Sequence, residues 1–304
     1  MISFVIPVYR SAKSLEELHK RIVDVFLTSE ASFEILFIVD CGSDESWNVV
    51  EQLAAKDRKV RGLKMSRNYG QHNALLCGIR EAKGEIIATL DDDLQHRPEE
   101  VPKLIEELYK GYDVIYAPPK KEQHGFLRNI SSRITKIALQ GAMGAECARH
   151  VSAMRVFRTN LRDAFTHYKS PTVNIDVLLT WGTSKFSAVR VEHDERKFGQ
   201  SGYTIYKLSR HALNMMTGFS TRPLQLASFI GFAFSFFGFI TLIFVLIRWM
   251  LEGSAVPGFA FLASIISVFS GAQLMALGII GEYLALMHLR TMGKPPYFVL
   301  SKTD

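Results

Sequence analysis

Cysteine is scarce in this chain. Its three residues, Cys41, Cys77 and Cys147, are widely separated and match neither a metal-binding nor a redox spacing. The pattern therefore gives no disulfide framework and indicates inert thiols in a reducing compartment. The sequence also has no Walker loop and no Gly-x-Gly-x-x-Gly turn. Both absences argue against an ATPase and against a dinucleotide-dependent enzyme. The N-terminus has no basic region or cleavage site, so we expect no signal peptide.

Charge is missing from two long segments near the end of the chain. Residues 223–247 and 253–281 contain no Asp, Glu, Lys or Arg. Each exceeds the roughly 20 apolar residues that cross a bilayer core, so we expect two transmembrane helices. The alternative is a buried helical hairpin of a soluble domain, but core helices rarely lack charge on every face for such a length.

The basic residues flank these segments. The link 251–257 has no Lys or Arg, whereas both flanks of the hairpin are basic. By the positive-inside rule both chain ends face the cytoplasm. The net charge of +6 is concentrated at these flanks and around residues 120–133. Attraction to anionic lipid head groups explains this distribution better than nucleic acid does, so we expect a membrane and no nucleic-acid partner.

The first part of the chain alternates strand and helix patterns, which predicts an α/β domain with a mostly parallel sheet and helices on both faces. The predicted strands are Ile2–Val8, Phe33–Val39, Val60–Met65, Glu85–Leu90 and Asp113–Ala117, and the predicted helices are Ser14–Leu27, Glu45–Lys56, Gln71–Ala82 and Glu99–Lys110.

Polar residues follow the carboxyl ends of four predicted strands, where ligands bind in such sheets. They are Pro7-Val8-Tyr9, Asp40, Ser66-Arg67-Asn68 and Asp91-Asp92-Asp93.

The acidic run is the sharpest local signal. Three adjacent carboxylates repel one another unless a cation joins them, and Mg²⁺ or Mn²⁺ prefers such oxygen ligands. On an extended segment Asp91 and Asp93 share a face, which leaves Asp92 on the other. We therefore expect Asp91 at the nucleotide and Asp93, with Gln95, at the metal. The alternative is a solvated acidic turn that caps the helix at Glu99.

Two further residues at the carboxyl ends of these strands have competing interpretations. Asp40 is a candidate for hydrogen bonds from a base or ribose, or it forms an Asx turn or helix cap. Arg67 can place a guanidinium near phosphates, although a lone turn arginine is more often a surface residue.

Three segments outside the sheet have basic or glycine-rich patterns. Residues 125–143 and 203–219 are amphipathic and basic, which is typical of interfacial helices and also of half-buried packing helices. The glycine-rich segment Arg196–Tyr203 can fold over a diphosphate, or it is a plain linker.

Taken in order, the motifs resemble one family over nearly the whole length. The chain resembles the polyprenyl-phosphate glycosyltransferases of family 2, which include dolichol-phosphate mannose synthase. It is most similar to bacterial enzymes of the undecaprenyl-phosphate 4-deoxy-4-formamido-L-arabinose transferase type. The matching motifs are Pro7-Val8-Tyr9, Asp40-x-Gly42-Ser43, Arg67–His72, Asp91-x-Asp93-Leu94-Gln95 with Pro98-Glu99-Glu100, Arg196–Tyr203, Gly271-Ala272-Gln273, Gly281-Glu282-Tyr283 and Pro296–Val299.

This resemblance implies a GT-A domain, a divalent metal (Mg²⁺ or Mn²⁺), a nucleotide-sugar donor with uridine favoured, an undecaprenyl-phosphate acceptor, inversion at the anomeric carbon and a place in the inner membrane. Asp93 and Arg196 would be catalytic. By motif, the resemblance assigns Pro7, Tyr9, Asp40, Arg67 and Asp91 to the nucleotide, Arg196 and Ser201 to the donor diphosphate, Asp91, Asp93 and Gln95 to the metal, and Arg128, Ser132 and Arg133 to the acceptor phosphate.

The chain departs from the family pattern at three points. Arg10-Ser11 replaces the usual Asn-Glu, and Cys41 replaces an acid. Ala153 stands where many relatives have an acid two residues before the arginine aligned with Arg155. No base is required there, because a phosphate monoester is largely dianionic at neutral pH.

The predicted organisation is a cytoplasmic GT-A domain (1–200) with an interfacial helix at 125–143, a juxtamembrane helix (201–222), a transmembrane hairpin (223–290) and a cytoplasmic tail (291–304). Small residues on the spans permit close packing and a homo-oligomer. A polysaccharide synthase and a non-catalytic scaffold or flippase partner are the alternative functions. Two spans and no recognisable acceptor motif disfavour the first, and the intact Asp91, Asp93 and Arg196 disfavour the second.

Overall fold

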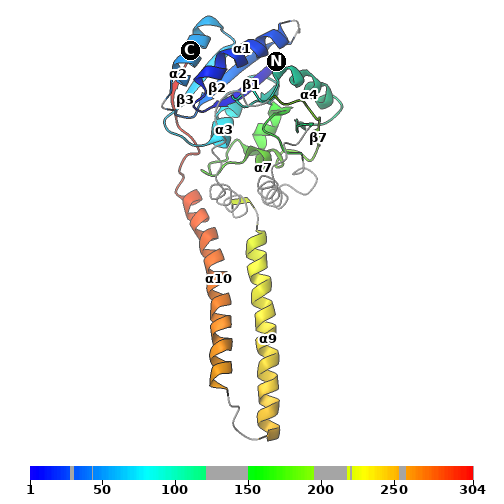
Figure 1. Ribbon diagram of the computed structural model, residues 1–304, viewed down its shortest axis with the longest axis vertical. Helices are drawn as coiled ribbons and strands as arrows, with labels where there is room; N and C mark the ends of the chain where they lie inside the picture. The colour runs from blue at the N-terminus through cyan, green and yellow to red at the C-terminus, as the bar shows by residue number, and fades with distance from the viewer. Residues whose placement is uncertain are drawn as a thin grey trace.

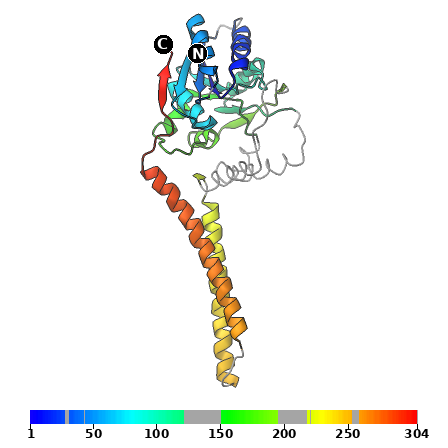
Figure 2. The ribbon, with the colours of Figure 1, turned by 60° about the vertical axis from the view of Figure 1, so that its left-hand side comes forward.

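The computed structural model describes residues 1–27, 31–42, 44–120, 150–194, 218–219, 221–252 and 258–303. They form an α/β domain and a long helical hairpin that projects from one end of it (Figures 1 and 2). The predicted interfacial helix at 125–143 lies outside the described residues, and so do residues 201–217 and 220 of the predicted juxtamembrane helix (201–222).

The sheet contains eight described strands in the order β7-β5-β6-β4-β1-β2-β3-β8. Its centre is parallel: β1 (Ile2–Val8) pairs with β2 (Phe33–Val39) and β4 (Ile86–Thr89), and β2 pairs with β3 (Val60–Met65). Every residue of β1, β2 and β4 is buried, which is why these strands are apolar at every position except Ser3, Glu34 and Thr89 and do not alternate with polar residues.

Helices cover both faces of this centre, as predicted. Alternate residues of β1 point to opposite faces: Phe4 packs with α1 (Ala12–Phe26) and α2 (Ser46–Lys56), whereas Val5 packs with α3 (Gln71–Glu81). On α1 the buried residues Leu15, Leu18 and Ile22 recur at helical spacing, and this spacing presents one apolar stripe to the sheet.

The remaining part of the sheet is mixed. β6 (Arg155–Arg158) lies between β4 and β5 (Val114–Tyr116) and is antiparallel to both, and β7 (Phe186–Ala188) is parallel to β5. Between β4 and β5 the chain forms the 3₁₀ turn η1 (Pro98–Glu100), which leads directly into α4 (Val101–Leu108). The helix predicted at 99–110 therefore begins as a 3₁₀ turn. After β6 come η2 (Thr159–Phe165) and α7 (Ile175–Leu179).

Two helices form the hairpin, α9 (Arg222–Glu252) and α10 (Phe259–Thr291). Their segments Pro223–Val245 and Val268–Thr291 are long and apolar enough to cross a membrane, and the side chains in their most apolar windows are not buried. A core hairpin of a soluble domain would be buried, so the exposed apolar surface favours lipid around these helices.

After α10 the chain returns to the sheet. β8 (Val299–Lys302) pairs antiparallel with β3 and forms the sheet edge, at the red end of the ribbon in Figure 2. The sequence predicted a tail over 291–304 but no strand within it.

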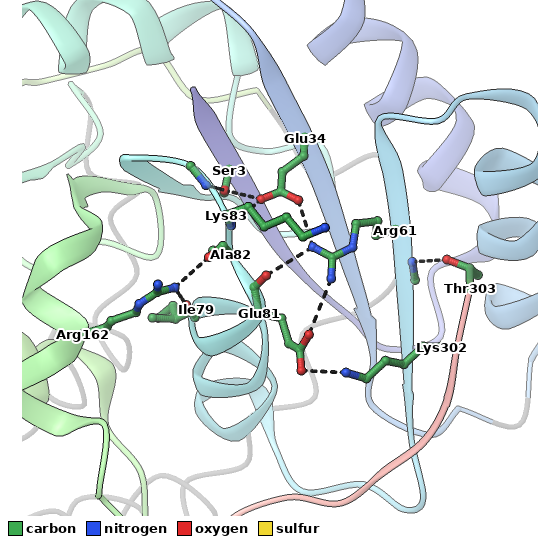
Figure 3. Close-up of polar contacts among 12 residues, drawn as sticks. Ser3, Glu34, Arg61, Ile79, Glu81, Ala82, Lys83, Arg162, Lys302 and Thr303 are labelled. Atoms are coloured by element: carbon green, nitrogen blue, oxygen red, sulfur yellow. Dashed lines mark hydrogen bonds and ion pairs between the residues drawn. The ribbon is translucent and has the colours of Figure 1, made fainter.

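A partly buried polar network at the amino ends of the strands helps to hold this edge (Figure 3). The Glu34 carboxylate accepts hydrogen bonds from Ser3 Oγ (2.6 Å), from the Lys83 amide (2.6 Å) and from Arg61 Nη1 (3.0 Å). Burial alone would raise the pKa of Glu34, but these hydrogen bonds lower it below its ordinary value. Arg61 also pairs with Glu81, and Lys302 of β8 pairs with Glu81 at 2.7 Å. The network therefore joins β2, β3, α3 and β8.

Candidate functional site

A cleft of about 270 Å³ opens at the carboxyl ends of β1, β2 and β4. The turns that follow these strands and β3 meet there because the parallel strands all point toward the same edge. The lining residues are Pro7, Val8, Tyr9, Asp40, Asn68, Gly70, Gln71, Asp91, Asp92 and Asp93. Each of the four turns singled out in the sequence thus contributes to one cleft.

The acidic run after β4 is held by hydrogen bonds from the neighbouring turns. Gln71 Nε2 donates to Asp91 Oδ1 at 2.7 Å, and the Gln95 amide donates to Asp93 Oδ1 at 3.1 Å. His96 Nδ1 lies 3.9 Å from Asp91 Oδ2. The outer two carboxylates are therefore oriented by groups that follow β3 and β4.

Asp92 lines the cleft as well, although the alternation of an extended segment placed it on the other side. Its carboxylate accepts a hydrogen bond from the Tyr9 amide at 2.9 Å, and its backbone carbonyl accepts one from Ser14 Oγ. Burial raises the pKa of Asp92 to about 6, and the neighbouring Asp91 and Asp93 carboxylates add to the rise. The alternation fails because the chain turns here, with Leu94 at a φ of 63°.

Backbone strain is concentrated in the turns at this end of the sheet. Among the described residues, the non-glycine residues with positive φ are Arg10, Cys41 and Leu94, and they follow β1, β2 and β4 respectively. A non-glycine residue in the left-handed region costs on the order of 1 kcal/mol or more, and such residues cluster at functional sites.

Asp40 fastens one of the turns. It is 3% exposed, and its two carboxylate oxygens accept hydrogen bonds from the Tyr69 and Gly70 amides, each at 2.7 Å. Burial raises the pKa of Asp40, although the two amides oppose the rise. The carboxylate thus holds the β3–α3 turn through long-range hydrogen bonds rather than through a local Asx turn, while its edge still lines the cleft.

The other predicted residues stand in two groups. Arg67 and Gln95 do not line the cleft, and Arg67 is exposed with its guanidinium 4.6 Å from the Tyr69 ring centre. The residues assigned to the donor diphosphate and the acceptor phosphate lie outside the described residues: Arg196, Ser201, Arg128, Ser132 and Arg133.

Sequence reasoning missed a buried ion pair beside the cleft. Arg155, at the start of β6, pairs with Asp176 of α7, and the Tyr116 hydroxyl donates to Asp176 Oδ1 at 3.1 Å. Arg155 is 2% exposed and Asp176 4% exposed. Twenty-one residues separate the partners, so no local pattern could reveal the pair.

Ala153, in the position of the family's acid, accepts a hydrogen bond through its backbone carbonyl from Thr89 Oγ1 at 2.8 Å.

The cleft suits a hard divalent cation that a phosphate helps to bind. Its Asp91 and Asp93 side chains offer oxygen donors, the type that Mg²⁺ and Mn²⁺ prefer. Across the described part of the chain, no group of three or more His, Cys, Asp and Glu side chains could hold a metal by itself. An ion here would therefore share its ligands with a bound substrate.

Comparison with known proteins decides the family. Residues 3–168 match the model of glycosyl transferase family 2, more than half of the chain. The chain belongs to this family. Its glycosyl transferase family 2 relatives include undecaprenyl-phosphate 4-deoxy-4-formamido-L-arabinose transferases. The protein from Sodalis glossinidius is 33% identical over 98% of this chain and 92% of its own length. The protein from Pseudomonas aeruginosa is 32% identical over 98% and 89%.

Solved structures of similar fold support the architecture. Glucosyl-3-phosphoglycerate synthase from Mycobacterium tuberculosis, in complex with Mn²⁺ and UDP-glucose, superposes with a TM-score of 0.54 at 13% identity and covers 71% of this chain and 77% of that one. Mannosyl-3-phosphoglycerate synthase from Rubrobacter xylanophilus gives 0.53 at 14% identity, with 74% of each chain covered. The α/β domain of this family 2 glycosyltransferase therefore has the GT-A fold.

Proposed function

We propose that this glycosyltransferase moves a sugar from a nucleotide-sugar donor to undecaprenyl phosphate or a similar polyprenyl phosphate, with inversion at the anomeric carbon. The observation that carries the proposal is an acid-lined cleft on a GT-A sheet in a chain with a membrane-length hairpin. Transfer to a lipid acceptor needs a cleft for the sugar donor, and the hairpin would keep that cleft near the membrane that contains the lipid. The names of relatives that align with 98% of this chain support the acceptor.

The donor would bind along the cleft. Pro7 and Tyr9 would contact the nucleotide base, and the edge of Asp40 together with the β3–α3 turn would border its sugar, because all these groups line one continuous surface. Arg67 belongs to this turn but does not line the cleft, and it would reach the donor from the edge of the cleft. Uridine is the nucleotide that the resemblance favours.

A divalent ion would be held by Asp91 and Asp93, with Gln95 reaching from the following turn. When bound, Mg²⁺ or Mn²⁺ would neutralise charge that develops on the departing nucleoside diphosphate. Arg196 and Ser201 are proposed to contact the same diphosphate, which would make Asp93 and Arg196 the catalytic pair.

The chemical step needs little proton transfer. An oxygen of the acceptor phosphate attacks the anomeric carbon, a carbon–oxygen bond forms, and the bond to the nucleoside diphosphate breaks on the opposite side. The attacking oxygen carries no proton in the phosphate dianion, so the Ala153 position requires no acid. The protein acts by aligning the reactants and stabilising the leaving group. Arg128, Ser132 and Arg133 are proposed to hold the acceptor phosphate.

The hairpin would place this reaction at a membrane surface. The resemblance favours the inner membrane, and the distribution of Lys and Arg favours a GT-A domain and both chain ends in the cytoplasm, where soluble nucleotide-sugars would reach the cleft.

The decisive experiment is transfer of radiolabel to undecaprenyl phosphate from a panel of UDP- and GDP-sugars by purified protein in detergent, with Mn²⁺ or with EDTA. We expect label in the lipid phase with one donor and none with EDTA. Nucleotide binding without transfer would point to a rarer sugar than those in the panel or to another acceptor. Absence of both would refute the enzyme assignment and favour a non-catalytic scaffold.

A further inference from the structure

The motif Pro296–Val299 lies after the second membrane helix, far in sequence from every residue of the cleft. In the structure it packs against the turn that lines the cleft between β3 and α3. The Ser66 amide donates to the Phe298 carbonyl at 3.0 Å, and Met65 pairs with Val299 across the sheet edge. The end of β3 is therefore fixed by a segment that follows α10.

Asn73 makes the second connection. It is 6% exposed, and its amide nitrogen Nδ2 donates to two carbonyls, those of Pro296 and of Pro171 (3.1 Å). Pro296 is itself buried. A buried amide with these two acceptors has one preferred placement, so it fixes the first turn of α3 relative to the C-terminal segment.

The same helical turn reaches the cleft. Gln71, two residues before Asn73, lines the cleft and donates to Asp91 Oδ1 at 2.7 Å. Gly70, which begins this turn with a φ of 94°, donates its amide to Asp40. A shift of α3 would therefore disturb both the Gln71–Asp91 and the Gly70–Asp40 hydrogen bonds.

Tyr297, which stands between Pro296 and Phe298 in the sequence, adds a packing contact with the α/β domain. Its ring packs against the core cluster that contains α3, and the Arg80 guanidinium lies 5.8 Å from the ring centre. Burial raises the pKa of the Tyr297 hydroxyl, as expected for a ring that is partly buried against the domain.

From these contacts we infer that Pro296–Val299 is a positioning element of the donor cleft, which acts through Asn73 and the β3–α3 turn rather than serving only as the tether of the membrane hairpin. The inference rests on the proposed function in so far as the cleft is taken to bind a nucleotide. It makes Asn73 and Tyr297 positioning residues for donor binding, since neither lines the cleft.

The test uses three variants of the full chain in detergent. Asn73→Ala removes the amide that bridges to Pro296. Tyr297→Ala weakens the C-terminal segment without touching Pro171. Thr303→Val is the matched control, because Thr303 Oγ1 accepts from the Gly62 amide at 2.7 Å at the other end of the same strand pairing. All three should lower thermal stability by a few degrees.

The first readout is binding of UDP with Mn²⁺, measured by calorimetry. We expect Kd to rise roughly 3- to 10-fold in the first two variants, the equivalent of one lost hydrogen bond, and to stay within about 2-fold in Thr303→Val. In turnover assays KM for the donor should rise while KM for the lipid acceptor stays unchanged. Equal Kd values in all three variants would overturn the inference. A shift in Asn73→Ala alone would also overturn it, because the effect would then run through Pro171.

The second readout does not depend on a nucleotide. Hydrogen exchange of the peptide containing residues 66–72 should accelerate in Asn73→Ala and Tyr297→Ala and remain unchanged in Thr303→Val. Wild-type protein that fails to bind UDP would count against the proposed function alone, and the exchange pattern would still decide the positioning role. Unchanged exchange in all variants would refute that role.

Discussion

The buried pair Arg155–Asp176 offers the largest stability effect that can be worked out from the contacts. Both side chains are almost completely enclosed, and Tyr116 donates a hydrogen bond to the same carboxylate. Arg155→Met leaves Asp176 charged and unpaired, and Asp176→Leu does the same to Arg155. Breaking a buried ion pair in this way costs about 3–5 kcal/mol.

Replacing both partners removes both charges. We therefore expect the double variant Arg155→Met/Asp176→Leu to recover most of the loss, since apolar residues of similar volume often replace buried ion pairs at little cost. The Tyr116 hydroxyl loses its hydrogen bond to Asp176 in the double variant, at a cost of about 1 kcal/mol.

The assay is heating in detergent with tryptophan fluorescence as the signal, which Trp47 and Trp181 of the α/β domain supply. For a domain of this size about 1 kcal/mol corresponds to roughly 2–4 °C, so each single variant should unfold about 6–20 °C below wild type. The double variant should lie within several degrees of wild type. Single substitutions that are mild and additive in the double variant would show that the pair is not coupled, and would refute the reasoning.

Three further predictions concern the cleft, the network of Figure 3 and the thiols. Asp93→Ala should abolish turnover and leave thermal unfolding near wild type, and full activity in this variant would remove the metal assignment. Glu34→Gln should lower Tm by about 2–12 °C at pH 7, the effect of about 1–3 kcal/mol lost from a charged acceptor. Because the folded-state pKa of Glu34 is lowered, its stabilisation is present above its unfolded pKa and is lost as pH falls through the folded value, so the difference from wild type should shrink below about pH 4. A difference that grows in acid would contradict this. Burial raises the pKa of Cys77 to about 12, so peptide mapping after treatment of folded protein with iodoacetamide should find Cys77 unmodified and the half-exposed Cys41 modified. Early modification of Cys77 would show that α3 opens readily.

The sequence predicted the parallel centre of the sheet because its signals are local. Ile2–Val8 and Phe33–Val39 are apolar except at Ser3 and Glu34, and the helix between them, α1, shows a regular apolar spacing. The antiparallel strand β6 has the sequence Arg-Val-Phe-Arg and four residues, too short and too charged to indicate a strand by itself. β8 has only four residues, and it is a strand because β3 leaves an edge that it can pair with.

The cleft was predictable to a similar extent. Strand ends identify which turns meet, so the sequence alone was enough to group Tyr9, Asp40 and Asp91. The contacts that orient these groups could not be foreseen. Gln71 donates to Asp91 across 20 residues, and Asp92 accepts from Tyr9 across 83 residues. Such pairs depend on the register of packed elements, which no local pattern encodes.

The edge strand β8 also bears on how the protein matures during synthesis. Chains are made from the N-terminus and domains fold as their residues become available. β8 follows both α9 and α10, so β3 has no partner on that side until the ribosome has passed the whole hairpin. The open edge of β3 can close only after the two apolar helices have emerged, by which time they have had the chance to enter lipid. Completion of the sheet thereby becomes a late event in biogenesis, and a nascent chain that stops short of β8 carries an unpaired strand edge that can pair with another chain.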